Sequence, residues 1–132
     1  FPRSHGGLQW SCRADRTMNY GGATSYCEDI GGRLPTISEL RTLVRNCPVS
    51  ETGGECRVND DCLNRASCWN LYECSCDRDD AGKYSVFDEV RKFWSSSEVE
   101  DYDRFQWTLG YNHALVARTI RDAFLYVTCV KE

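Results

Sequence analysis

The fold is decided by residues 31–40, whose sequence is GGRLPTISEL. Within this segment Thr36 and Glu39 have the spacing of a capping box, in which each side chain bonds a free backbone amide at the start of a helix. The apolar residues that follow recur at helical spacing and share one face: Leu40, Leu43, Val44 and Cys47. The segment therefore predicts an amphipathic helix that begins directly after Thr36.

The segments on either side of this helix predict an α+β fold. Upstream, apolar residues at helical spacing predict a second helix over residues 22–30, stopped by Gly31-Gly32, and residues 8–12 resemble a strand. Downstream, four segments have strand character and are separated by polar or turn-prone residues: 93–96, 105–109, 114–119 and 124–130. Early helices followed by antiparallel strands are typical of one α+β domain, here over residues 1–132.

Nine cysteines dominate the composition. Six of them lie in residues 47–76, a long segment with almost no aliphatic periodicity: Cys47, Cys56, Cys62, Cys68, Cys74 and Cys76. A loop of this length is uncommon in a compact domain unless it is functional or cross-linked, so we expect a disulfide-stapled insert. Its connectivity stays open, although Cys74 and Cys76 are too close for an easy mutual bridge. This many disulfides predict an extracellular or cell-surface protein.

Charge and hydropathy argue against two classes of partner. A formal net charge of −4 disfavours nucleic acid, which needs a basic surface. No stretch approaches the ~20 apolar residues of a membrane span, so we expect no membrane insertion. No signal-peptide pattern opens the chain, which suggests a mature or excised piece.

Three motifs taken together resemble a known family. They are GGRLPTISEL at 31–40, FWSSS at 93–97 and VTCV at 127–130. The combination is similar to the Fibrobacter-succinogenes-type major paralogous domains and the related C-terminal domains of bacterial collagen-like proteins, and the likeness covers residues 10–130. The resemblance implies a C-type-lectin-like fold, with two helices packed on a twisted antiparallel sheet. It also implies a bacterial adhesin, in some relatives a homotrimer at the tip of a fibre.

The same resemblance bears on individual residues. It implies a disulfide between Cys27 and Cys129. The chain departs from the family pattern at Thr128, where arginine is usual, so a basic binding groove is not expected. Cys12 is then left over. We expect a buried free thiol there; the alternatives are an intermolecular bridge and a different set of pairings.

Metal sites are disfavoured by spacing. The cysteines at 56, 62, 68 and 74 are six residues apart and have no nearby histidine, whereas structural zinc sites use closely paired ligands. Asp77, Asp79, Gly82 and Asp88 have the spacing of part of a calcium loop, but Ala81 occupies a ligand position. The Glu-Pro-Asn and Gln-Pro-Asp motifs of calcium-dependent lectins are absent. We therefore expect no cofactor, with calcium as the alternative.

Catalysis is not expected. A Ser-His-Asp set would have to use His5 or His113, and there is no Gly-x-Ser-x-Gly elbow. Carboxylates are numerous, so a glycan-active hydrolase is kept as a third hypothesis.

Aromatic and polar residues in loops predict the binding surface. Rings beside amides and carboxylates suit glycans and also protein partners. The candidates are Trp69 and Tyr72 in the insert, and Asp101, Tyr102, Asp103, Arg104, Tyr111, Asn112 and His113 in predicted loops. Trp10, Trp94 and Trp107 lie in strand patterns and are predicted core; for Trp69 and Tyr72 the alternative is a small core under the disulfides. The leading function is recognition of cell-surface glycan, with protein–protein recognition or a trimerising fibre tip as the alternative.

Overall fold

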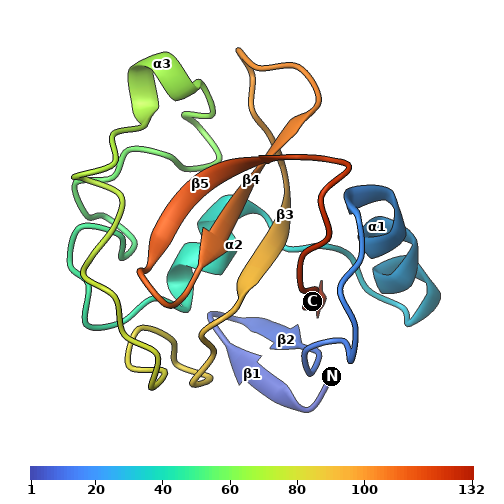
Figure 1. Cartoon of the computed structure of the whole chain (residues 1–132). Coiled ribbons are helices and arrows are strands. Elements are labelled where there is room, and N and C mark those ends of the chain that lie inside the picture. The colour runs from blue at the N-terminus through green and yellow to red at the C-terminus, as the bar shows by residue number, and fades with distance from the viewer.

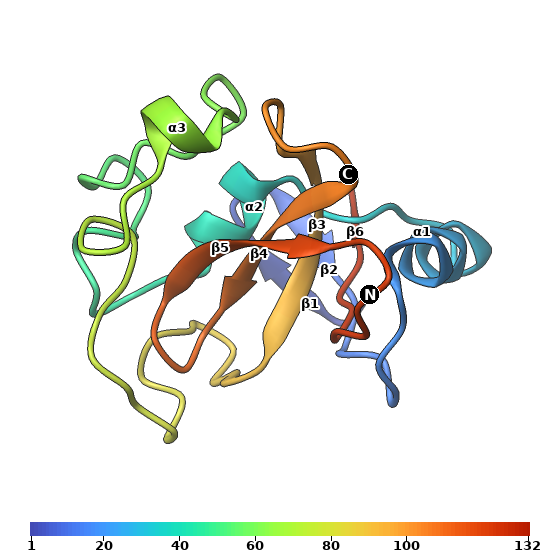
Figure 2. The same cartoon turned by 45° about the horizontal axis from the view of Figure 1, so that its top comes forward.

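Two three-stranded antiparallel sheets and three short helices form the protein, shown here as a computed structural model that describes residues 1–132 (Figures 1 and 2). The first sheet has the order β1-β2-β6, with β1 (Arg3–His5), β2 (Leu8–Trp10) and β6 (Val130–Lys131). The second has the order β3-β4-β5, with β3 (Lys92–Glu98), β4 (Phe105–Gly110) and β5 (Leu115–Ile120). The helices are α1 (Tyr20–Asp29), α2 (Ile37–Thr42) and α3 (Arg65–Cys68). The α+β class is confirmed.

Helix α2 starts where the capping box predicts and ends earlier than predicted. The Thr36 hydroxyl accepts from the Glu39 amide at 3.1 Å, and the Glu39 carboxylate accepts from the Thr36 amide at 2.8 Å. Val44 was predicted on the helix but forms an antiparallel bridge with Ser85 beyond its end. The apolar residues after Thr42 are still buried, but they enter the core in extended and turn conformations. Their tertiary contacts therefore outweigh the helical spacing of the sequence.

Helix α1 begins two residues before the predicted start. The Asn19 side chain caps it by accepting from the Gly22 amide at 2.9 Å, so the cap offsets two glycines that are poor helix formers. The predicted stop is confirmed, since Gly31 has a φ of 89°, a conformation open to glycine at no steric cost. Figure 1 shows α1 at one side of the molecule, far from the insert.

The C-terminal segment is not the continuous strand that was predicted over residues 124–130. Only Val130 reaches β6, whereas Leu125 bridges Met18 and Tyr126 bridges Phe93. The segment changes hydrogen-bond partners because it passes from one sheet to the other. Its side chains alternate because they are buried between the two sheets, and not because the segment pairs with a single neighbouring strand.

Three tryptophans lie in the core, as predicted. Trp10, Trp94 and Trp107 are fully buried, and each indole N–H donates to a backbone carbonyl at 2.8–3.1 Å. The bonds satisfy the polar atom of each ring, so the rings can fill the interior without an unpaired donor. None of the helices has the length and apolar character required to cross a lipid bilayer.

Four disulfides cross-link the chain. The predicted bond between Cys27 and Cys129 is confirmed, and it joins α1 to the C-terminal segment. The insert is closed by three nested bonds: Cys47–Cys76, Cys56–Cys74 and Cys62–Cys68. All six cysteines of the insert are therefore in disulfides. Such cross-linking is typical of an extracellular protein. The predicted buried state of Cys12 is wrong, since this free thiol is exposed.

Candidate binding site

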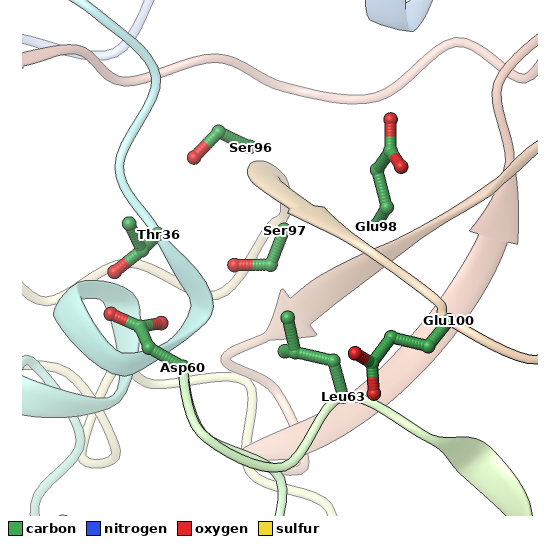
Figure 3. Close-up of a pocket in the computed structure, with 7 residues that line it drawn as sticks. All are labelled: Thr36, Asp60, Leu63, Ser96, Ser97, Glu98 and Glu100. Carbon is green, nitrogen blue, oxygen red and sulfur yellow. The ribbon is translucent and has the colours of Figure 1, made fainter.

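A polar pocket of about 480 Å³ lies where the insert meets the second sheet (Figure 3). Its walls come from the start of α2, from the insert before α3, and from the end of β3 with the hairpin that follows. Seven residues line it: Thr36, Asp60, Leu63, Ser96, Ser97, Glu98 and Glu100. The pocket is within the size range of small-ligand sites, and its lining offers mostly hydroxyl and carboxylate oxygens.

The hydroxyl wall is positioned by a β-bulge. The register between β3 and β4 shifts between Trp94 and Glu98, and within this bulge the Ser95 hydroxyl donates to the Trp107 carbonyl at 2.6 Å. The bulge brings Ser97 to the first turn of α2, where its Oγ accepts from the Ile37 amide at 2.9 Å. The Ser97 side chain is thus held by one bond to α2, and its backbone amide donates to the Ser95 hydroxyl at 3.1 Å.

The acidic wall joins the insert to α2. Asp60 and Ser38 bond reciprocally: the Ser38 amide donates to the Asp60 carboxylate at 3.2 Å, and the Asp60 amide donates to the Ser38 hydroxyl at 2.7 Å. Figure 3 shows the Asp60 carboxylate facing the Thr36 and Ser97 hydroxyls, while Glu100 lies over Leu63. The insert thereby places a carboxylate opposite the hydroxyl wall.

The charges of the pocket are only partly balanced. Glu98, whose carboxylate points away from the hydroxyls in Figure 3, pairs with Arg121 at 3.0 Å. Asp60 and Glu100 have no basic partner within 4.0 Å. The pocket is therefore a site of net negative charge.

A second set of contacts locks the hairpin onto the insert. The Asp101 carboxylate accepts from the Arg65 and Ala66 amides at 2.7 and 3.1 Å, and the Glu100 amide donates to the Leu63 carbonyl at 3.1 Å. The Asp101 pKa is lowered: partial desolvation acts to raise it, but the two amide bonds and the nearby Arg65 charge outweigh that effect. We call these contacts the hairpin latch.

The predicted candidates in the hairpin have different surroundings. Tyr102 is half-buried, because its ring stacks on Phe105 at 3.9 Å and carries the Arg65 guanidinium at 3.9 Å on a ring face. Asp103 and Arg104 are exposed, and Arg104 forms an ion pair of 3.6 Å with Asp122. Asp101 and Tyr102 thus support the wall of the pocket, whereas Asp103 and Arg104 face solvent.

The two aromatic candidates of the insert also differ. Trp69 is half-buried against the main core, its indole N–H donates to the Val116 carbonyl at 2.6 Å, and Arg118 covers its ring at 4.3 Å. Trp69 therefore has a packing role, but it packs on the main core and not in a separate small core under the disulfides. Tyr72 is 88% exposed beside the half-exposed Leu71, so its ring is available to a partner.

The structure does not place the candidates Tyr111, Asn112 and His113 beside those of the hairpin, and it buries Tyr111. These three residues follow β4, whereas the hairpin precedes it, so six residues of strand separate the two loops by about 20 Å (Figure 1). Tyr111 is 1% exposed and donates to the Leu40 carbonyl at 2.9 Å, and burial, with a smaller contribution from Glu89, raises its pKa. The Asn112 and His113 carbonyls accept bonds from residues 79 and 76 of the chain that returns from the insert.

The sequence contained weak signals for the pocket. The three consecutive serines at 95–97 belong to the FWSSS motif and were not predicted to bind, and Asp60 was not among the predicted site residues. Glu100 belonged to a predicted loop, but nothing placed it near Thr36. No group of three or more His, Cys, Asp or Glu side chains is arranged to hold a metal ion.

Comparisons with known proteins do not extend this description. No protein-family model, curated protein or solved structure matches the chain. The family resemblance of the three motifs therefore stays a prediction.

Proposed function

We propose that this chain is an extracellular recognition domain of the adhesin type, with a C-type-lectin-like fold, that binds cell-surface glycan at the polar pocket. The observation that carries the proposal is the pocket itself, whose three walls come from separate segments and are joined by the Asp60–Ser38 bonds and the hairpin latch. A site that is built before the ligand arrives loses little conformational entropy on binding.

The lining favours a hydroxylated ligand. Carboxylates such as Asp60 and Glu100 accept hydrogen bonds from sugar hydroxyls, serine hydroxyls both donate and accept, and Leu63 offers apolar surface to C–H groups. The net negative charge of the pocket disfavours sulfated and other acidic glycans. We accordingly propose a glycan without acidic groups as the ligand.

Protein recognition is the alternative, and one observation favours it. Leu71 and Tyr72 project from the insert between residues that are tied by Cys68 and Cys74, and exposed aromatics on rigid turns are frequent anchors of protein interfaces. A trimerising fibre tip belongs to this alternative. A hydrolase is third, because carboxylates line the pocket, but we propose no catalytic residue.

A glycan array separates these functions. We expect wild-type protein to bind non-acidic glycans with and without calcium chelator, and Asp60→Asn to weaken that binding while Tyr72→Ser leaves it intact. Binding that is lost with Tyr72→Ser but retained with Asp60→Asn would place the site at the insert tip. An array without any bound glycan contradicts the proposal.

A further inference from the structure

The segments around the pocket hold most of the acidic side chains of the chain. Residues 50–80 and 98–103 contain 12 of the 20 aspartates and glutamates but only 3 of the 16 lysines and arginines. The remainder of the chain has more basic than acidic residues. A ligand that approaches the pocket therefore meets a negative potential, which attracts cations and repels anions.

Two carboxylates of the pocket lack a cation. Asp60 and Glu100 have no ion pair, while most basic side chains elsewhere lie beside a carboxylate or over an aromatic ring. Nearby carboxylates repel one another, and a bound cation removes that repulsion. The carboxylates lie on either side of Leu63, so a ligand seated on Leu63 would come within reach of both (Figure 3).

A largely buried hydroxyl faces the same pocket and can donate to a ligand. Ser97 is 8% exposed, and its Oγ accepts from the Ile37 amide but donates to no acceptor of the protein. Figure 3 shows this hydroxyl directed at the space between Thr36 and Asp60. Because the Ser97 hydroxyl only accepts within the protein, its proton is available to an acceptor oxygen of a ligand in the pocket.

We infer, on the basis of the proposed function, that the ligand is a glycan that contains an amino sugar with a free, protonated amine. The ammonium group lies against Asp60 or Glu100, and a neighbouring hydroxyl oxygen of the sugar accepts from Ser97. An ammonium beside a hydroxyl supplies both the cation that the carboxylates lack and the acceptor that Ser97 lacks. A neutral sugar supplies only the acceptor oxygen for Ser97, and an amine without hydroxyls supplies only the cation for the carboxylates.

The test uses two oligosaccharides of equal length. One is an oligomer of glucosamine with free amines, the other the same oligomer with every amine acetylated, and each is titrated calorimetrically into the full chain below the pKa of the amine. We expect the free-amine oligomer to bind more tightly, with Asp60→Asn and Glu100→Gln each weakening it about three- to five-fold, as for one partly exposed ion pair. Asp61→Asn is the matched control, because Asp61 is an exposed neighbour outside the pocket.

Each other outcome overturns the inference. Equal affinity for the two oligomers would show that the free amine is not recognised, while glycan binding itself would still stand. Equal binding of hexalysine, with the same response to Asp60→Asn, shows that charge alone is recognised and that the ligand is not a sugar. If neither oligomer binds, the amino sugar is wrong, and the glycan array decides separately whether the proposed function survives. Weakening by Asp61→Asn equal to that by Asp60→Asn shows diffuse attraction in place of a site.

Discussion

Replacement of Arg41 by methionine should destabilise the whole domain through the insert. Arg41 is 3% exposed, and its guanidinium has no carboxylate partner. Instead it donates to four carbonyls of the insert at 2.6–2.9 Å: those of Ser50, Glu51, Cys56 and Val58. One side chain of α2 thus satisfies acceptors along the first limb of the insert.

The magnitude follows from the burial of those acceptors. Ser50, Cys56 and Val58 are at most 2% exposed, so water cannot replace the guanidinium at their carbonyls without a structural opening. An unpaired buried acceptor costs about 1–3 kcal/mol, and the removal of a buried charge returns part of that cost. We expect Arg41→Met to lower the free energy of unfolding by about 2–4 kcal/mol, which corresponds to a fall of about 10 °C in Tm for a chain of this length.

The measurement is thermal unfolding by near-ultraviolet circular dichroism at neutral pH without reductant, with limited proteolysis to locate the weakened segment. Arg45→Met is the matched control, because Arg45 makes only an exposed ion pair with Asp88, of little expected worth. Arg41→Lys should fall between, since an ammonium cannot reproduce a planar fork of donors. A Tm for Arg41→Met within about 1 °C of that for Arg45→Met would refute the reasoning.

Three further results are expected. Thr36→Ala should cost about 0.5–2 kcal/mol in chemical denaturation by removing the α2 cap, whereas Thr36→Ser should be nearly neutral; equal losses would contradict the capping role. Cys12 should be the one cysteine alkylated by iodoacetamide without reductant, as peptide mapping can show. Asp101 and Glu39 have lowered pKa values in the folded state, so the stability they contribute is complete above the ordinary carboxyl pKa and is lost as pH falls through the lowered value. Asp101→Asn should reduce that acid dependence, and an unchanged stability–pH profile would exclude the hairpin latch as its source.

The sequence predicted those features that depend on neighbouring residues. The capping box located the start of α2, and the strand character of residues 93–96 and 105–109 located β3 and β4. It failed where partners distant in the sequence decide the outcome. Tyr111 was predicted exposed because it stands beside a turn, but its ring enters the core below α2 and its hydroxyl bonds Leu40.

The pocket was hidden from the sequence for the same reason. Thr36, Asp60, Ser97 and Glu100 come from three separate parts of the chain, and each is unremarkable among its neighbours. The side chains become a site only because a β-bulge turns Ser97 toward α2 and the insert folds back over the hairpin. Neither the β-bulge nor the folding of the insert over the hairpin can be predicted from local sequence periodicity.

The insert shows how such a site can be rigid without a core of its own. A segment of this length with almost no aliphatic periodicity buries too little apolar surface to offset its ordering entropy. Three disulfides reduce that entropy in the unfolded chain, Arg41 supplies the bonds that a ladder would supply, and the hairpin latch fixes the outer end. These supports use cysteine side chains, backbone carbonyls and one carboxylate, so the exposed side chains of the insert that make no such contact are not needed for its fold. Substitutions at exposed positions such as Tyr72 and Asp61 can therefore change the surface of the insert without loss of the fold, which suits the proposed recognition function.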